Sequence, residues 1–576
     1  MYSYGDGQSS PTLCPWRCNL TALSQRCNIY LIASNTVIHV YRPSFPSQSV
    51  SKPELVIHPP SMGRSAPGVF QANPLSINRI LVDYLGNEEI LLLVRDDGDV
   101  IGYRIEEIHR ALERRTNQDE PTSEDNIPVF LHRNVGGSAW GLAIHREARI
   151  IAISANTHCV TVIAYALDGD PARKAENVFT LYGVGNMPAI CFTVDSGNFL
   201  LSAGIKGEAT LWDLRVRNWA SEFKVGYCKN AVNLKPPKDI EGACGCRPGF
   251  NNNNHAIWGV MALDTRSAYE FTEAKEEQEL ILPAQSVVLD VTDQKYQFVR
   301  EEDAYICPGS GYENVTEYVA DHMASLMSPG AGDTYFVEFL ALNVNTNTEM
   351  TDSPPEHPTQ YYPHIVLSTT EVPLQPYCEA NLKITNQLSK PFLIISKEAI
   401  FLVQYPEPRD TPKDKESFRN YVVAMRRPLQ LGKWTAVLHP MDRLCYFEQI
   451  PELGVFLVGS PLGRVGVFTL YWTKDKDNPQ PRYGFRLEHM LPYRHDGDGK
   501  VARYMGISKL IGLAVGPVQG MFDQPANSES EHGEEEQAPQ PRRWRVLLHY
   551  TDSTVLSFEL SKRRESNSPG LDEIIV

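Results

Sequence analysis

Cysteine and histidine side chains bind zinc when three or four of them lie close together, and two groups in the chain have these residue types. The first group matches the ligand set of a tetrahedral three-cysteine, one-histidine site: Cys228, Cys244, Cys246 and His255. The second group has no nearby histidine: Cys14, Cys18 and Cys27. Neither group contains a Cys-x-x-Cys pair, and the Gly and Asn residues around the first group favour a loop. We therefore expect no metal site.

The glycine-rich segments lack the spacing of phosphate-binding or catalytic motifs. Gly183-Val184-Gly185 lacks the third glycine of a dinucleotide-binding loop, and no Gly-x-x-x-x-Gly-Lys-Ser/Thr sequence is present. The segment Gly136–Trp140 has some likeness to a nucleophile elbow, but Trp140 stands where the second glycine is required. A turn that leads into a strand is the better interpretation of this segment. We expect no catalytic residue and no cofactor.

Composition and charge limit the class of partner. Of the 576 residues, 42% are hydrophobic and 22% are charged, which is typical of a folded protein. The net charge of −16 disfavours a broad contact with DNA or RNA, which requires many Lys and Arg residues. No apolar run is long enough for a membrane span, and Met1–Thr12 is too polar for a secretory signal. We expect protein partners, no direct nucleic acid, no membrane, and a nuclear or cytoplasmic location with reduced cysteines.

A pattern of two strands joined by a short polar turn recurs along the chain. The seven copies are Ile29–Ser34 with Thr36–Tyr41, Ile90–Arg95 with Val100–Tyr103, Arg149–Ser154 with Cys159–Tyr165, Phe199–Ala203 with Glu208–Trp212, Phe392–Ser396 with Ala399–Tyr405, Val455–Gly459 with Arg464–Phe468, and Arg545–Tyr550 with Thr554–Phe558. Such apolar pairs are typical of β-hairpins, which cannot bury their apolar faces alone. Stacking them around a ring buries these faces. The pattern predicts an all-β propeller with seven blades, or eight as the alternative.

The expected boundaries follow these repeats. A single propeller of residues 1–576 divides into N-terminal blades (13–215), a long insertion (216–390), C-terminal blades (391–560), an acidic loop (522–541) and a tail (561–576). Within the insertion, His364–Thr370 has the composition of a strand. This strand is the basis for a degenerate eighth blade.

Further strand signals precede some hairpins at the distance of an inner blade strand. These signals are Trp140–His145, Ala189–Phe192 and Trp434–Pro440. The clearest complete unit is Met187–Arg215, where a turn, an apolar strand and a Trp-Asp ending closely resemble a WD repeat. The other copies are degenerate.

Two segments resemble a known family. Gly86–Arg104, with the string Leu-Leu-Leu-Val-Arg-Asp-Asp-Gly-Asp-Val-Ile-Gly-Tyr, and Asn134–Leu167, with Ser-Ala-Trp-Gly-Leu-Ala-Ile-His-Arg-Glu, resemble the fungal family of WD-repeat regulators of ribonucleotide reductase gene expression. The resemblance covers roughly the first third of the chain and is weaker from Trp434 to Trp472. It implies control of the transcription of ribonucleotide reductase genes, and association with a cullin-type ubiquitin ligase linked to replication stress.

The segment Trp212-Asp213-Leu214-Arg215 fits the W-D-x-R ending of many propellers that serve as substrate receptors for cullin ligases. In that class the Arg projects from the bottom of the blade toward the adaptor, so Trp212, Asp213 and Arg215 are the predicted partner-binding residues. The usual pattern also has an Asp six residues before the Trp, where this chain has Lys206. The alternative is that Trp212 and Asp213 only close a blade while Arg215 is solvated.

The repeats predict a non-enzymatic WD-repeat scaffold, and the family resemblance implies that it regulates transcription of ribonucleotide reductase genes. A substrate receptor or adaptor of a cullin-type ubiquitin ligase, acting in the replication stress response, is a compatible alternative, because a receptor can regulate transcription by degrading a regulator. A propeller hydrolase or lyase is the alternative from another class. It requires acid, base or metal groups that converge near the ring axis, and the sequence shows no such constellation.

Overall fold

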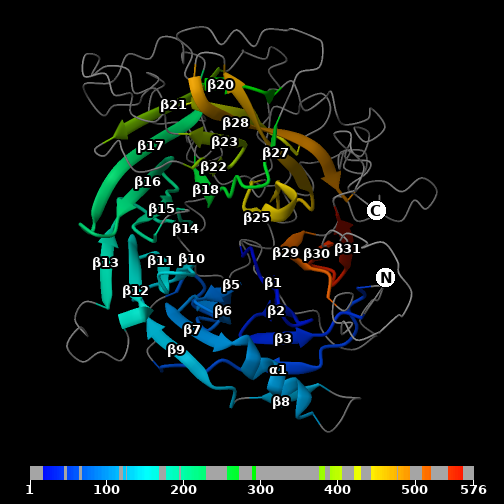
Figure 1. Ribbon diagram of the computed structural model, residues 1–576. Coiled ribbons are helices and arrows are strands. Elements are labelled where there is room, and N and C mark those ends of the chain that lie inside the picture. Colours follow the sequence, from blue (N-terminus) through cyan, green and yellow to red (C-terminus); the bar gives the residue numbers. More distant parts are fainter. Residues whose placement is uncertain are drawn as a thin grey trace, which may run out of the picture.

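Seven β-sheets, arranged around one axis, make up the part of the chain that the computed structural model describes (Figure 1). The described residues are 17–44, 48–63, 68–115, 121–124, 126–167, 177–193, 196–228, 256–270, 288–292, 375–382, 390–404, 421–429, 443–475, 478–492, 509–519 and 543–561. No helix within these ranges has the length and apolar character to cross a membrane.

The first four sheets, called blades 1 to 4, are built almost entirely from consecutive strands. Blade 1 contains β1 (Thr21–Leu23), β2 (Tyr30–Ser34), β3 (Val37–Tyr41), β4 (Leu55–Ile57) and β8 (Thr122–Glu124); blade 2 contains β5 (Ile77–Leu85), β6 (Glu88–Arg95), β7 (Asp99–Arg104) and β9 (Val129–Asn134); blade 3 contains β10 (Ala139–His145), β11 (Ile150–Ala155), β12 (Cys159–Ala164) and β13 (Val178–Tyr182); blade 4 contains β14 (Ala189–Phe192), β15 (Phe199–Ala203), β16 (Glu208–Asp213), β17 (Asn218–Cys228) and β21 (Gln375–Leu382).

The remaining strands form blades 5 to 7. Blade 5 contains β18 (Ile257–Ala262), β22 (Phe392–Ser396), β23 (Ala399–Gln404), β24 (Tyr421–Arg426) and β20 (Val288–Asp290); blade 6 contains β25 (Tyr446–Ile450), β26 (Val455–Gly459), β27 (Val465–Asp475), β28 (Asn478–Leu491) and β19 (Tyr269–Glu270); blade 7 contains β29 (Leu510–Pro517), β30 (Trp544–Tyr550) and β31 (Val555–Leu560). The described helical segments are α1 (Ile105–Glu113), η1 (Tyr165–Leu167) and η7 (Pro451–Leu453).

The ring is closed, because the first strand of each blade lies against the first strand of the next. This inner series runs through β1, β5, β10, β14, β18, β25 and β29, and β29 packs on β1 again (Figure 1). The middle strands are therefore covered on both faces, and β2 is buried along its whole length. Burial on both faces explains why these strands consist of continuous apolar runs. The predicted all-β propeller with seven blades is confirmed, and each predicted hairpin forms the second and third strands of one blade.

Blade 1 meets blade 7 where the ring closes, and within the described residues the two blades share no strand. The Leu20 N–H donates a hydrogen bond to the Ile511 carbonyl at 3.1 Å. The Tyr30 hydroxyl and His549 Nδ1 lie 3.1 Å apart, and burial lowers the pKa of His549 to about 4. Arg545 Nη1 also donates to Asn28 Oδ1 at 2.8 Å. The closure thus depends on packing and hydrogen bonds between the first and last parts of the chain.

The ring has two faces that carry different turns, because consecutive strands of a blade are antiparallel. The top face carries the residues that precede each inner strand, such as Cys18, and the turns between second and third strands, such as that at Lys206. The bottom face carries the turns between first and second strands, such as Arg146–Arg149, and the turns after third strands, such as that at Arg215. A residue's place in its blade therefore decides the face on which it lies.

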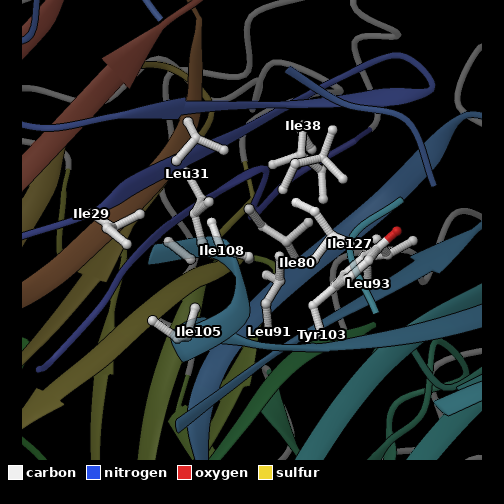
Figure 2. Packing of buried hydrophobic residues seen from close by; sticks show 14 of the residues in the cluster. Ile29, Leu31, Ile38, Ile80, Leu91, Leu93, Tyr103, Ile105, Ile108 and Ile127 are labelled. Carbon is white, nitrogen blue, oxygen red and sulfur yellow. The ribbon is translucent and has the colours of Figure 1, made fainter. Parts of the chain in front are cut away.

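Apolar clusters fill the spaces between neighbouring blades. Figure 2 shows one of them, where Leu31 and Ile38 of blade 1 face Leu91 and Leu93 of blade 2. The helix α1 follows the third strand of blade 2 and adds four buried side chains to this cluster: Ile105, Ile108, Ala111 and Leu112. At 25 cal/mol per Å², each such large side chain contributes about 1.5–3 kcal/mol when fully buried. The core is thus distributed around the ring as layers between blades.

One predicted inner strand is wrong. The first strand of blade 6 is β25 (Tyr446–Ile450), which pairs with β26 in a register that begins at Tyr446 and Gly459. The expected segment, Trp434–Pro440, lies outside the described residues. The pairing of β25 is favoured because η7 and Gly454, which has a φ of +66°, close a short hairpin between the two strands.

The range 216–390 contains strands of three blades. It supplies β17 and β21 to blade 4, β18 and β20 to blade 5, and β19 to blade 6. The expected strand His364–Thr370 lies outside the described residues, as do the acidic loop 522–541 and all of the tail 561–576 except residue 561.

Candidate functional site

Trp212 is a buried part of blade 4. The strand β16 pairs with β15, and the Trp212 indole Nε1–H donates a hydrogen bond to Ser202 Oγ at 2.9 Å. Only 4% of Trp212 is exposed. Trp212 is one of the three predicted partner-binding residues. Because it is buried and bonds Ser202, it joins β15 to β16 and is not available at the surface.

Asp213 and Arg215 form a two-pronged ion pair at the end of β16. Arg215 Nε donates to Asp213 Oδ1 at 2.9 Å, and Nη2 donates to Oδ2 at 2.7 Å. The Arg215 backbone N–H also donates to Oδ1 at 3.0 Å. The hydrogen bond from the Arg215 side chain lowers the pKa of Asp213, so this carboxylate remains ionised at neutral pH. The turn fixes the direction of the guanidinium, because a planar fork matches a carboxylate.

The aromatic ring of Phe199 lies against the guanidinium of Arg215. Its guanidinium carbon lies 5.1 Å from the ring centroid of Phe199, a buried residue of β15. The Arg215 side chain is nevertheless 46% exposed, whereas that of Asp213 is 3% exposed. An Arg that is held on one side by a carboxylate and a ring loses little side-chain entropy when its other side binds a partner.

The residues after Arg215 extend this surface. Val216 is 65% exposed, which is unusual for a large apolar side chain in the described part of the molecule. Arg217 follows, and its guanidinium carbon lies 4.7 Å from the ring centroid of Phe179, in β13 of blade 3. We call Arg215, Val216 and Arg217 the blade-4 patch. It presents an apolar side chain between two cations on the bottom face, a combination that suits an acidic partner segment with an apolar residue.

Lys206 occupies the position where the usual W-D-x-R pattern has an Asp. It lies in the turn between β15 and β16, and its Nζ donates to the Val184 carbonyl at 3.1 Å. This turn is on the top face, at the other end of β16 from Arg215. The departure from the pattern therefore does not alter the contacts of the blade-4 patch.

A second Asp-x-Arg turn has the same local geometry elsewhere on the bottom face. After β18 of blade 5, the Arg266 backbone N–H donates to Asp264 Oδ1 at 3.0 Å and its Nε donates to Oδ2 at 2.8 Å. The Arg266 side chain is 79% exposed, and within the described residues no aromatic ring lies against it. The two turns thus share the ion pair and differ in what supports the guanidinium.

A group of polar side chains on the inner strands was not predicted from the sequence. Arg79 and Asp83 belong to β5, and Glu448 belongs to β25. Burial raises the pKa of Glu448 to about 7 and that of Asp83 to about 6, while the charge of Arg79 opposes the shift at Glu448. Arg79 Nε has no hydrogen-bond partner among the described residues. Charged residues inside apolar strands were the available signal, since each interrupts an apolar segment.

Both cysteine groups that were considered as possible zinc ligands are only partly described. Cys18 and Cys27 are described, whereas Cys14, Cys244, Cys246 and His255 are not. The described residues contain no cluster of three or more His, Cys, Asp or Glu side chains arranged to hold a metal ion. Cys18 does, however, lie beside Cys445, a residue that the sequence did not single out.

Comparison with known proteins gives two distant relatives. A WD40 repeat-containing protein of Dictyostelium discoideum is 25% identical over 202 residues, which cover 35% of this chain and 25% of that protein. An uncharacterized WD repeat-containing protein of Schizosaccharomyces pombe is 24% identical over 282 residues, which cover 47% of this chain and 48% of that protein. The chain thus spans about half or less of the length of these relatives.

No protein-family profile matches the chain. Among solved structures, Raptor of Chaetomium thermophilum gives a TM-score of 0.39 at 9% identity, with coverage of 95% of this chain and 28% of that chain. The sheet topology and the two relatives together describe a WD40-repeat β-propeller. Proteins of this class generally serve as scaffolds for protein interactions and are typically not enzymes.

Proposed function

We propose that this chain is a non-enzymatic WD-repeat scaffold that regulates transcription of ribonucleotide reductase genes. The resemblance of Gly86–Arg104 and Asn134–Leu167 to that family of regulators supports the proposal. These segments supply β6 and β7 of blade 2 and β10 to β12 of blade 3, so the likeness falls on blade strands. A scaffold role agrees with a ring whose two faces and rim offer separate surfaces to different proteins.

A substrate receptor or adaptor of a cullin-type ubiquitin ligase is the second function that we propose. One observation carries it: the Arg215 guanidinium is fixed by Asp213 and Phe199 at the bottom face and still keeps 46% of its side chain exposed. The W-D-x-R class contacts its ligase adaptor through an Arg at this position of the blade. The exposed Val216 and the second cation, Arg217, enlarge the surface that such an adaptor would cover.

The regulatory proposal predicts that loss of the protein changes ribonucleotide reductase transcript levels. Transcripts are measured in cells with and without the gene, both in normal growth and under replication stress. A change that is restored by the wild-type gene supports the proposal. Equal transcript levels under both conditions contradict it.

The ligase proposal is tested by affinity purification of the tagged full chain from its native cells, followed by mass spectrometry. Wild-type protein is compared with Arg215→Glu and with the matched control Arg266→Glu, which changes the same type of Asp-x-Arg turn on the same face. We expect a cullin and its adaptor with the wild type and the control, and their loss with Arg215→Glu. Capture that survives Arg215→Glu, in a variant with unchanged thermal stability, contradicts the assignment of Arg215.

A further inference from the structure

Two cysteines from distant parts of the chain meet at the top face near the axis. Cys18 precedes β1 of blade 1 and Cys445 precedes β25 of blade 6, 427 residues further along the chain. The Cys445 Sγ–H donates a hydrogen bond to Cys18 Sγ at 3.4 Å. A second hydrogen bond joins the two segments, since the Asn19 side-chain Nδ2 donates to the Cys445 carbonyl at 3.3 Å. Blade 7 lies between blades 1 and 6 in the ring, so the contact bypasses a whole blade.

An arginine completes the arrangement and favours the thiolate form of Cys18. Arg443 Nη2 donates to Cys18 Sγ at 3.4 Å, and its guanidinium carbon lies 4.2 Å from the ring centroid of Trp258. The hydrogen bond from Cys445, together with the charge of Arg443, lowers the pKa of Cys18 to about 5. Burial and the neighbouring Cys18 raise the pKa of Cys445, so the pair holds one proton at neutral pH.

The environment distinguishes Cys18 from other described cysteines. Cys18 is half-buried and Cys445 is buried, so a small molecule reaches the thiolate more easily than the thiol. Burial raises the pKa of Cys191 to about 12 and also raises that of Cys27. Because the thiolate is the reactive form, Cys18 is the best nucleophile of these three.

We propose that Cys18 and Cys445 form a redox modification site, at which a small two-electron oxidant of the hydroperoxide class produces a disulfide between blade 1 and blade 6. The Cys18 thiolate attacks one oxygen of hydrogen peroxide, and the O–O bond breaks. Hydroxide departs as the leaving group, and Cys18 becomes a sulfenic acid. Cys445, after losing its proton, attacks the Cys18 sulfur, the S–O bond breaks, and a second hydroxide leaves. The Cys445 proton neutralises one hydroxide and a proton from the solvent neutralises the other, so one hydrogen peroxide and the two sulfur groups become two waters and one disulfide.

The cross-link has a structural consequence that follows from the closure of the ring. Blades 1 and 7 share no strand within the described residues, so hydrogen bonds such as that from Leu20 to Ile511 hold the ring shut. A bond from Cys18 to Cys445 would join the strands on either side of blade 7. The disulfide would enclose a large part of the chain in one loop and would therefore strongly lower the conformational entropy of the unfolded state. The sulfur atoms need to approach from 3.4 Å to about 2.0 Å, which requires a small local movement.

The reduced full chain is treated with hydrogen peroxide, blocked with an alkylating agent and digested, and the peptides are identified by mass spectrometry. We expect the peptides of Cys18 and Cys445 to be joined and two hydrogens lighter than the sum of the free peptides. The joined peptides should form at least about tenfold faster than oxidation products of Cys27 and Cys191, as expected from their thiolate fractions. Recovery of both cysteines as free thiols, or of Cys18 as a sulfinic acid without a link, overturns the proposal.

Four variants separate the roles of the groups. In Cys445→Ser, Cys18 should accumulate as a sulfenic acid that dimedone traps, because the second thiol is missing. Arg443→Met should slow formation of the disulfide, whereas the equally buried Arg464→Met, on the neighbouring turn, should not. The oxidised wild type should melt at a higher temperature than the reduced protein, and dithiothreitol or Cys18→Ser should abolish this difference. Equal rates for the two arginine variants would contradict the role of Arg443.

Discussion

At the bottom face of blade 4, Asp213 and Arg215 meet in a pair that lowers the pKa of the acid. Around the axis, Arg79 of β5 opposes Glu448 of β25, yet burial raises the pKa of this acid to about 7. Both regions combine an arginine with a carboxylate. They differ because Asp213 accepts three hydrogen bonds from Arg215, whereas Arg79 Nε has no partner within the described residues.

The hydrogen bonds at the blade-4 patch stabilise the charged form of the acid, which suits a binding surface. Burial at the axis disfavours the charged form of the acid. At the blade-4 patch, the acid remains ionised and orients an exposed cation, which agrees with the binding role proposed for this patch. At the axis, removal of water disfavours the ionised form of Glu448, and charge there reduces the stability of the ring. An arginine beside a carboxylate is thus found with a lowered pKa of the acid at the blade-4 patch and a raised pKa at the axis, because the hydrogen bonds and the burial differ.

The largest expected effect concerns Trp212, which is buried in β16 of blade 4. Trp212→Ala should lower the free energy of unfolding by about 3–5 kcal/mol, because it leaves a cavity and removes the hydrogen bond that Ser202 Oγ accepts from the indole. Trp258→Ala at the axis should cost less, because Trp258 is only half-buried. Calorimetric melting of the two variants measures this contrast. Equal losses would show that blade 4 is no better packed at this position than the axis.

The axis should show a pH dependence that Glu448 controls. Its pKa in the folded state, about 7, lies above that of an unfolded chain, so the folded protein binds the proton more tightly. The contribution of Glu448 to stability is therefore largest below about pH 4.3 and declines as the pH rises toward 7, by about 1–2 kcal/mol for a partly buried group. Glu448→Gln should remove this decline. A variant that follows the wild-type pH profile of melting temperature contradicts the assignment.

Asp213 should behave with the opposite sign and a smaller magnitude. Its pKa is lowered in the folded state, so its contribution to stability is present above about pH 3.9 and is lost as the pH falls through the folded value. Asp213→Asn should cost about 0.5–1 kcal/mol at pH 7, because Arg215 is half exposed and water screens the pair. Urea denaturation at pH 7 and pH 3 measures the cost. A deficit of equal size at both pH values would exclude the ion pair as its source.

The sequence predicted the blades because their middle strands are covered on both sides. Runs such as Leu91–Val94 and Phe392–Ile395 are buried throughout, so their apolar character is continuous and easy to recognise. The outer strands are harder, since β21 joins blade 4 from a point far along the chain. Strand Tyr446–Ile450 was missed because three of its five residues are only half-buried and two of those are polar.

The candidate sites differ in the same way. A local motif was enough to find Asp213 and Arg215, because the whole ion pair lies within one turn. The sequence did not place the rings of Phe199 and Phe179 at this surface. Phe179, for example, belongs to blade 3 and contacts Arg217 only in the folded chain. The contact between Cys18 and Cys445 leaves no sequence pattern at all, because 427 residues separate them.

The most direct test of the proposed recognition surface is the affinity of the purified chain for the purified adaptor of the proposed cullin ligase from the same cells. Wild type, Arg215→Glu and Arg266→Glu are compared by isothermal titration calorimetry at fixed ionic strength. We predict that Arg215→Glu raises the Kd at least about tenfold, or about 1.4 kcal/mol, and that Arg266→Glu changes it less than about twofold. Equal affinities of the two variants, or no binding by the wild type, would contradict the role proposed for the blade-4 patch.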